Sequence, residues 1–108
     1  MISIEDFKKA ELKIAKILSA ERVEGSEKLI KLKVSLGEEE ERQLVAGIGK
    51  AYEPEALIGK EIVIVANLEP RTLMGEESQG MLLAASEGDG LPVLLAPERE
   101  IAPGSSVR

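Results

Sequence analysis

The chain contains no cysteine and no histidine. Without cysteine, disulfides and thiolate metal sites are excluded, and without histidine the commonest general base and metal ligand are missing. Serine–histidine and cysteine–histidine catalysis are therefore impossible within this chain. The sequence also carries no phosphate-binding loop, no dinucleotide-binding signature and no evident carboxylate pair. We expect a chain that is not itself catalytic and that uses no cofactor or metal.

Long apolar runs are also missing. No stretch approaches the roughly 18–20 apolar residues that cross a bilayer, and residues 1–10 have no apolar signal core. We therefore expect a cytoplasmic location and no membrane partner. The 108 residues have the length of one domain, without an internal repeat, low-complexity tract or linker, which predicts a single domain over 1–108.

Aromatic side chains and positive charge are scarce. Phe7 and Tyr52 are the whole aromatic supply, so the chain cannot build the stacking platform of a typical single-strand binder. The net charge of −6 argues against broad nonspecific binding of nucleic acid. The first half is nearly balanced in charge and the second half is acidic, so only the first half can supply a basic face. An RNA partner would be recognised through its shape, backbone and 2′-hydroxyls.

Short apolar and alternating segments fill most of the chain. Segment 29–36 alternates cleanly, with an apolar face at its even positions and Lys31 and Lys33 on the other face. We expect further strands over 12–18, 42–48, 61–68, 80–85 and 91–96. The segment 37–41, a glycine followed by four glutamates, reads as a hairpin tip, and a solvated, edge-protecting loop is favoured there over a metal site.

Helix signals and strand order together define the expected fold. Ser3, with Asp6 three residues later, predicts a short N-terminal helix. Pro54 and Gly59 bracket a second short helix between the third and fourth strands. The order predicts an all-β fold, a five-stranded OB-fold Greek-key barrel with a C-terminal strand and turn extension.

The segment 66–85 is crowded with polar and turn-forming residues between two apolar runs, a pattern typical of functional loops. It contains the runs Ala-Asn-Leu-Glu-Pro-Arg at 66–71 and Glu-Ser-Gln-Gly-Met-Leu-Leu-Ala-Ala at 77–85. Other distinctive runs are Val-Glu-Gly-Ser-Glu-Lys-Leu at 23–29, Arg-Gln-Leu-Val-Ala-Gly-Ile at 42–48 and a late Pro-Gly at 103–104. Together with 7–14, these runs resemble the tRNA-binding domain of methionyl-tRNA synthetases, which also occurs as a synthetase β subunit, as free-standing dimeric tRNA-binding proteins and in endothelial-monocyte-activating-polypeptide-type proteins.

The resemblance covers nearly the whole chain and carries specific implications. It implies an OB-fold that binds tRNA by overall shape without reading an anticodon, and that assists a methionyl-tRNA synthetase catalytic subunit in cis or in trans. It also implies a homodimer with the C-terminal region at the interface. The tRNA surface that it implies consists of Lys28, Lys31, Lys33, Arg42, Asn67, Arg71, Ser78, Gln79 and Met81.

Several of these residues also have a structural interpretation. Lys31 and Lys33 share a strand face, which Arg42 on the next strand could flank; three phosphate contacts would give a log–log salt slope of roughly −2 to −3. The alternative is a solvated face with protective lysines. Asn67 could instead bond loop backbone, and Met81 could be barrel core.

Two departures from the family pattern reduce positive charge beside Arg71. Glu69 stands where the family often has lysine, and Thr72 where it often has a basic residue. Binding should then depend more on the lysines of the second strand. The apolar stretch 91–96, with Ile101 and Val107, exceeds what one small barrel needs, and a two-fold partner could cover it. The competing function is a secretion-type chaperone of the same fold that binds unfolded polypeptide.

Overall fold

The computed structural model describes residues 1–37 and 39–108. Its elements are α1 (Ile4–Lys8), β1 (Leu12–Arg22), β2 (Ile30–Ser35), β3 (Glu41–Ala46), α2 (Pro54–Leu57), β4 (Glu61–Val65), β5 (Arg71–Leu73), β6 (Glu76–Ser78), β7 (Met81–Leu82), β8 (Ala84–Ala85), β9 (Val93–Leu94) and β10 (Ser106–Val107). Within the described ranges, no helix is long and apolar enough to cross a membrane.

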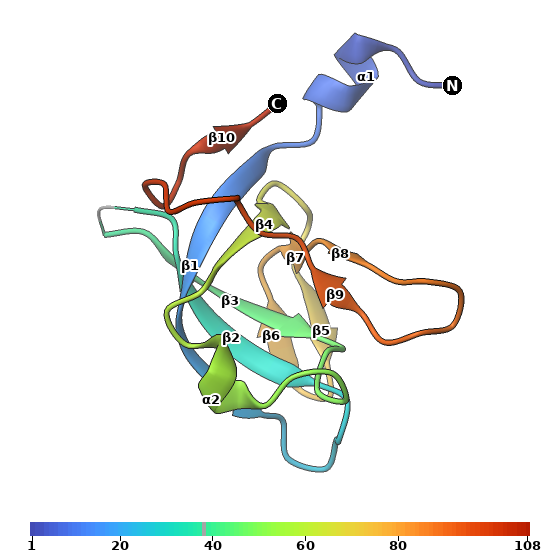
Figure 1. Cartoon of the computed structure of the whole chain (residues 1–108), viewed down its shortest axis with the longest axis vertical. Helices are drawn as coiled ribbons and strands as arrows, with labels where there is room; N and C mark the ends of the chain where they lie inside the picture. The colour runs from blue at the N-terminus through green and yellow to red at the C-terminus, as the bar shows by residue number, and fades with distance from the viewer. Residues whose placement is uncertain (38) are drawn as a thin grey trace.

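Five antiparallel strands form an OB-like barrel in the order β3-β2-β1-β4-β7, which confirms the predicted all-β fold (Figure 1). β1 is the shared strand, because its first half pairs with β4 and its second half with β2. The register with β2 shifts between Ile17 and Ser19. Such an irregularity bends a strand and increases its twist, which lets one long strand serve two sides of a small barrel.

The core lies inside this barrel and is aliphatic. Ile30, Leu32 and Val34 of β2 are fully buried, as their alternation predicted. α2 covers the barrel with buried Leu57, and the backbones at Gly59 and Lys60 bond Ile17 on β1. Pro54 begins α2 as expected, and Gly59 follows it with a φ of +88°, a conformation that favours glycine.

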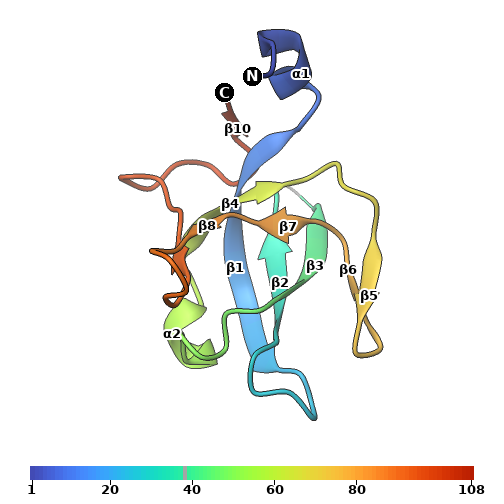
Figure 2. The same cartoon turned by 90° about the vertical axis from the view of Figure 1, so that its right-hand side faces the viewer.

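The polar run after β4 folds into a hairpin that the sequence did not predict. β5 and β6 pair with each other and stand outside the barrel beside β3 (Figure 2). Met74 and Gly75 make the turn with φ values of +47° and +81°. Two successive positive values are typical of the tight hairpin turns that match strand twist. The segment expected to be a loop is therefore an ordered arm of the barrel.

The chain ends lie together at one end of the barrel (Figures 1 and 2). Ser3 caps α1 as predicted, since its Oγ accepts a hydrogen bond from Asp6 N at 3.1 Å. β10 pairs with the start of β1, with Val107 opposite Leu12, and extends the sheet. The strand expected at 80–85 is divided into β7 and β8, because β7 pairs with β4 whereas β8 pairs with β9.

The tip between β2 and β3 includes Glu38, which lies outside the described residues. On either side of it, Leu36 N donates to Glu40 O at 2.9 Å and Glu40 N donates to Gly37 O at 3.0 Å. Within residues 1–37 and 39–108, no group of three or more acidic side chains is placed to hold a metal ion.

Candidate nucleic-acid interface

A groove of about 380 Å³ runs between the β5–β6 hairpin, the end of β3 and β7. It brings together Lys28, Arg71 and Met81, three of the residues expected at a tRNA surface. Its floor is largely apolar and includes Leu29, Val45, Ala46, Ile48, Leu73, Leu82, Ala84 and Pro92. Two cations beside an apolar floor suit a ligand that offers both phosphates and the flat edges of sugars or bases.

Lys28 owes its position to a neighbouring glycine. A Cβ at Gly47 would come within 2.9 Å of Lys28 Cε and 3.5 Å of its Cγ. The aliphatic stem of Lys28 therefore lies across Gly47, and the missing side chain makes that path open. The backbone reinforces the arrangement, because Gly49 N donates to Lys28 O at 2.7 Å.

Arg22 holds the two loops around Lys28 together, a role that the sequence did not reveal. Its Nη1 donates to Glu27 O at 3.1 Å and Gly49 O at 2.9 Å, and its Nη2 pairs with Glu53 at 3.3 Å. A planar guanidinium suits several acceptors at once. The contacts join segments far apart in sequence, so local pattern gave no sign of them.

Arg71 and Met81 form the other wall of the groove. Arg71 lies on β5 and is exposed, and within the described part of the chain it makes no ion pair. Met81 is 44 % exposed, whereas Leu82 beside it is buried. Met81 therefore lies on the surface next to Arg71 rather than in the barrel core.

Lys31 and Lys33 lie on the outer face of β2, as their alternation predicted, but they differ in charge environment. Lys31 Nζ pairs with Glu21 at 3.0 Å and Glu76 at 3.4 Å. The hydrogen bonds that Lys31 donates to Glu21 and Glu76 raise the pKa of Lys31 above its ordinary value. Lys33 is exposed and has no ion pair among the described residues, so it is the more available cation.

Arg42 does not flank these lysines. In the β2–β3 register it lies opposite buried Val34, whereas Gln43 lies opposite Lys33. Directly paired residues share a sheet face, so Arg42 leaves the lysine face. Its guanidinium instead donates to the carbonyl of Ala66 and pairs with Glu40 at 3.0 Å. The expected grouping of the three cations is wrong, because Arg42 pairs with Val34 of the apolar face and not with Lys31 or Lys33.

Ser78 and Gln79 close the barrel between β3 and β7. Ser78 is only 1 % exposed; its Oγ accepts from Val45 N and donates to Gly80 O, both at 3.0 Å. Gln79 N donates to Gln43 O at 2.8 Å, and Gln79 Oε1 accepts from Gln43 N at 2.9 Å. The Oγ of Ser78 and the Oε1 of Gln79 thus accept from backbone amides of β3, as a neighbouring strand would.

Asn67 is likewise bonded to backbone, as the structural reading of this residue anticipated. Its Oδ1 accepts from Glu11 N at 2.8 Å, and its Nδ2 donates to Lys9 O at 2.7 Å. The partners lie at the junction of α1 and β1, not in its own loop. Of the nine expected residues, Lys28, Lys33, Arg71 and Met81 keep exposed side chains that make no such bond within residues 1–37 and 39–108.

Residues 12–106 match the family described as "Putative tRNA binding domain". The chain belongs to this family. Curated relatives include methionine–tRNA ligases of Caldanaerobacter subterraneus and Thermotoga maritima, which are 59 % and 58 % identical over 106 residues. The match covers 98 % of this tRNA-binding domain but 16 % of either relative, so the chain spans about a sixth of their length.

Solved structures resemble this tRNA-binding domain over its whole length. A methionyl-tRNA synthetase-related protein from Pyrococcus horikoshii is 38 % identical, with a TM-score of 0.94 and coverage of 100 % of this chain and 98 % of that one. The chaperone CsaA from Bacillus anthracis is 34 % identical, with a TM-score of 0.91 and coverage of 100 % and 99 %. A methionyl-tRNA synthetase-related protein and a chaperone thus both share the fold of this tRNA-binding domain.

Proposed function

We propose that this chain binds tRNA by shape, without reading its sequence. The observation that carries the proposal is the groove that exposed Lys28 and Arg71 line together with apolar residues, in a member of a tRNA-binding family. The two cations contact phosphates, and Met81 packs against a ribose or base edge. Lys33 adds a contact on the outer face of β2. With two aromatic residues in the chain, affinity rests on backbone and 2′-hydroxyl contacts rather than stacking.

The other motif residues support this surface from within. Arg42, Ser78 and Gln79 fix β3 against the segment that carries Met81, since Arg42 also donates to Gln79 O. Lys31 is held by two carboxylates and contributes little free positive charge. Direct contact is therefore assigned to the exposed residues, and rigidity of the groove to the buried ones. Rigid support matters because shape recognition requires a preformed surface.

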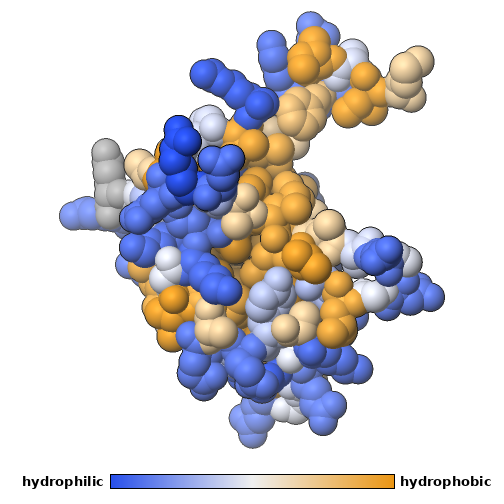
Figure 3. Space-filling model, in the orientation of Figure 1, coloured by the Kyte–Doolittle hydropathy of each residue, from blue (hydrophilic) through white to orange (hydrophobic). Residues whose placement is uncertain are grey.

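The binding unit is a homodimer. α1 buries none of its residues against the barrel, and an apolar band extends from it over the face seen in Figure 3. Exposed apolar residues of the two ends are Ile2, Ile4, Phe7, Leu91, Val93, Leu95 and Ile101. A second copy that covers this band would double the tRNA contacts in one complex.

The biological role is assistance to a methionyl-tRNA synthetase in the cytoplasm, in cis or in trans. The support is the identity of 59 % to one segment of such an enzyme. The chain contributes tRNA affinity, and catalysis belongs to the synthetase. Sedimentation of the chain with and without a methionyl-tRNA synthetase catalytic subunit tests the association.

A gel shift with mixed tRNA at increasing salt tests tRNA binding, and a pair of charge reversals tests the groove. Arg71→Glu should weaken binding at least about tenfold, because it replaces an attraction with a repulsion beside phosphate. Arg99→Glu changes the net charge equally but lies outside the groove and should have a much smaller effect. Both variants should keep the wild-type melting temperature. Equal losses for the two variants would show that only net charge matters.

A chaperone function is the second candidate, because the similarity to CsaA structures and the apolar groove floor also suit unfolded polypeptide. The two functions differ in salt dependence. Phosphate contacts weaken steeply with salt, whereas apolar contacts do not. Binding of a permanently unfolded peptide at all salt concentrations, with no tRNA shift at low salt, would favour the chaperone.

A further inference from the structure

The side chain of Asn67 continues the β1–β4 ladder beyond the end of β4. The last paired rung is Leu12 opposite Val65, and Ala66 N then donates to Glu11 O at 2.7 Å. The backbone turns away at this point. Asn67 supplies the next contacts with its side chain, because Oδ1 accepts from Glu11 N and Nδ2 donates to Lys9 O. Both ends of the amide are therefore used by backbone groups at the junction of α1 and β1.

This contact matters because α1 has little else to hold it. The helix has five residues, of which none is buried, and isolated helices of that length are not stable in water. Its last carbonyls lack partners within the helix. Among the described residues, the hydrogen bonds between segment 1–11 and the rest of the chain are those of Asn67 and Ala66.

We propose that Asn67 is a positioning residue for self-association, an inference that rests on the proposed homodimer. Its hydrogen bonds to Lys9 O and Glu11 N fix the direction of α1. Ile4 and Phe7 of α1 then form one surface with the apolar C-terminal residues, and a second copy binds this surface. The occupant is a second copy because α1 and the segment around β9 both expose apolar residues, and these form one continuous apolar band on the face seen in Figure 3.

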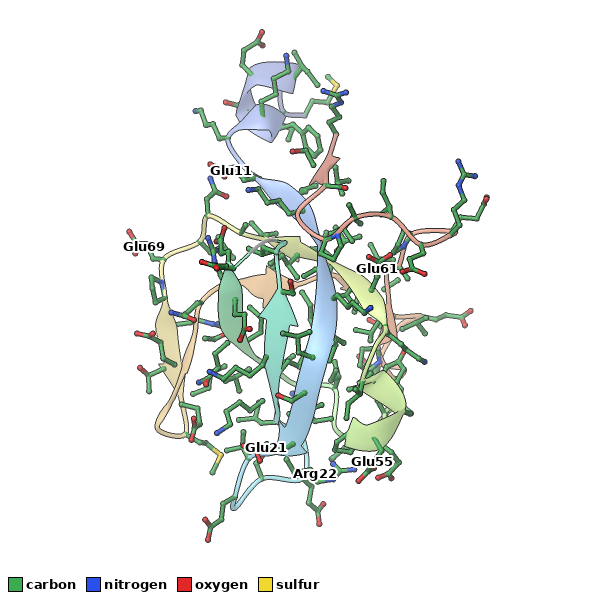
Figure 4. The ribbon with its side chains drawn as sticks, turned by 90° about the vertical axis from the view of Figure 1, so that its left-hand side faces the viewer. Glu11, Glu21, Arg22, Glu55, Glu61 and Glu69 are labelled. Carbon is green, nitrogen blue, oxygen red and sulfur yellow. The ribbon has the colours of Figure 1, made fainter. Side chains whose placement is uncertain are left out.

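The same side chain links the dimer surface to the tRNA groove. Glu11 lies at the end of β1 below α1, Glu69 lies on the loop nearby, and Glu21 and Arg22 lie at the opposite end (Figure 4). Arg71 follows Asn67 by four residues. Asn67 therefore lies between α1 and the segment that presents Arg71, with its own amide occupied by protein. It affects tRNA binding only by directing α1 toward the second copy.

Sedimentation velocity over a concentration series tests the proposal on the full chain. Asn67→Ala removes both hydrogen bonds and should raise the dimer dissociation constant about tenfold. Asn67→Asp keeps an acceptor for Glu11 N but loses the donor to Lys9 O, so its effect should be intermediate. Thr72→Ala, an exposed change in the same segment, should leave association unchanged.

Hydrogen exchange distinguishes a local loss of the Asn67 contacts from a general loss of stability, which would reduce amide protection throughout the barrel. Protection of the Glu11 amide should be lost in Asn67→Ala and kept in Asn67→Asp, while the amides of β2 stay protected in both. tRNA affinity, measured with each variant at concentrations where it is fully dimeric, should match the wild type. A tRNA defect that persists in the full dimer would make Asn67 a direct contact and overturn the proposal.

Two outcomes separate this inference from the function on which it rests. A wild-type chain that stays monomeric at every concentration would refute the homodimer, and with it the role of Asn67 in association. A dimeric wild type with an equally dimeric Asn67→Ala would refute the positioning role and leave the dimer standing. If Asn67→Ala does not fold, the comparison of Asn67→Asp with the wild type decides.

Discussion

At the scale of the residue, a cation contributes to RNA binding only if no carboxylate neutralises it. Lys31 and Lys33 look equivalent in the sequence, because both lie on the polar face of one alternating strand. The fold brings Glu21 and Glu76 to Lys31 and leaves Lys33 without an ion pair among the described residues. The sequence could predict which way both side chains point, but not which of them is free.

Removing the two carboxylates should recruit Lys31 to the tRNA surface. The double change Glu21→Gln and Glu76→Gln leaves Lys31 charged but unpaired, so it becomes available to a phosphate. We expect tighter binding and a log–log salt slope steeper by roughly 0.7–0.9, the value of one added contact. The matched control is Glu98→Gln with Glu100→Gln. This double change alters the net charge by the same amount, at a site that does not include Lys31. Equal gains in both double variants would contradict a local effect at Lys31.

At the scale of the element, strands in which apolar and polar residues alternate were predictable from the sequence, whereas the β5–β6 hairpin beside them was not. β2 follows the period-2 pattern that a half-buried strand requires. The β5–β6 hairpin lacks an apolar face of its own, so its sequence resembles a loop. Ser78 and Gln79 look like surface groups, yet they bond β3 residues more than 30 positions earlier. Such long-range partners leave no trace in local pattern.

The loop after β3 sets the position of Lys28, and a single methyl group should disturb it. In Gly47→Ala, the added Cβ would meet Lys28 Cε at 2.9 Å. The end of a flexible side chain can move aside, so stability should change by less than about 1 kcal/mol. tRNA affinity should fall, because Lys28 no longer lies along the groove wall.

A double-mutant cycle with Lys28→Met checks that the effect passes through Lys28. In the Lys28→Met background, Gly47→Ala should cause no further loss of tRNA affinity. Thermal unfolding of all four proteins controls for a change in the fold. Additive losses of affinity would mean that the methyl group acts on the groove directly, for example by filling space that the ligand needs.

At the scale of the whole molecule, an acidic chain must bind a polyanion through a few well-placed cations. The net charge is −6, so long-range attraction does not favour tRNA. Among the cations expected at the tRNA surface, Lys28, Lys33 and Arg71 are exposed and have no ion pair in the described ranges, so they remain for phosphate contact. Self-association then becomes important, because it presents two such sets to one tRNA.

The salt dependence of binding should therefore report the number of chains that touch each tRNA. Three contacts from one chain give a log–log slope of roughly −2 to −3, and two chains on one tRNA give roughly −4 to −6. Phe7→Glu places a charge on the exposed apolar face of α1 and should yield a monomer, which sedimentation verifies. We expect the steeper slope for the wild type and the shallower slope for this variant. The same slope in both would mean that one chain of the dimer binds each tRNA, and a slope near zero would contradict phosphate contacts altogether.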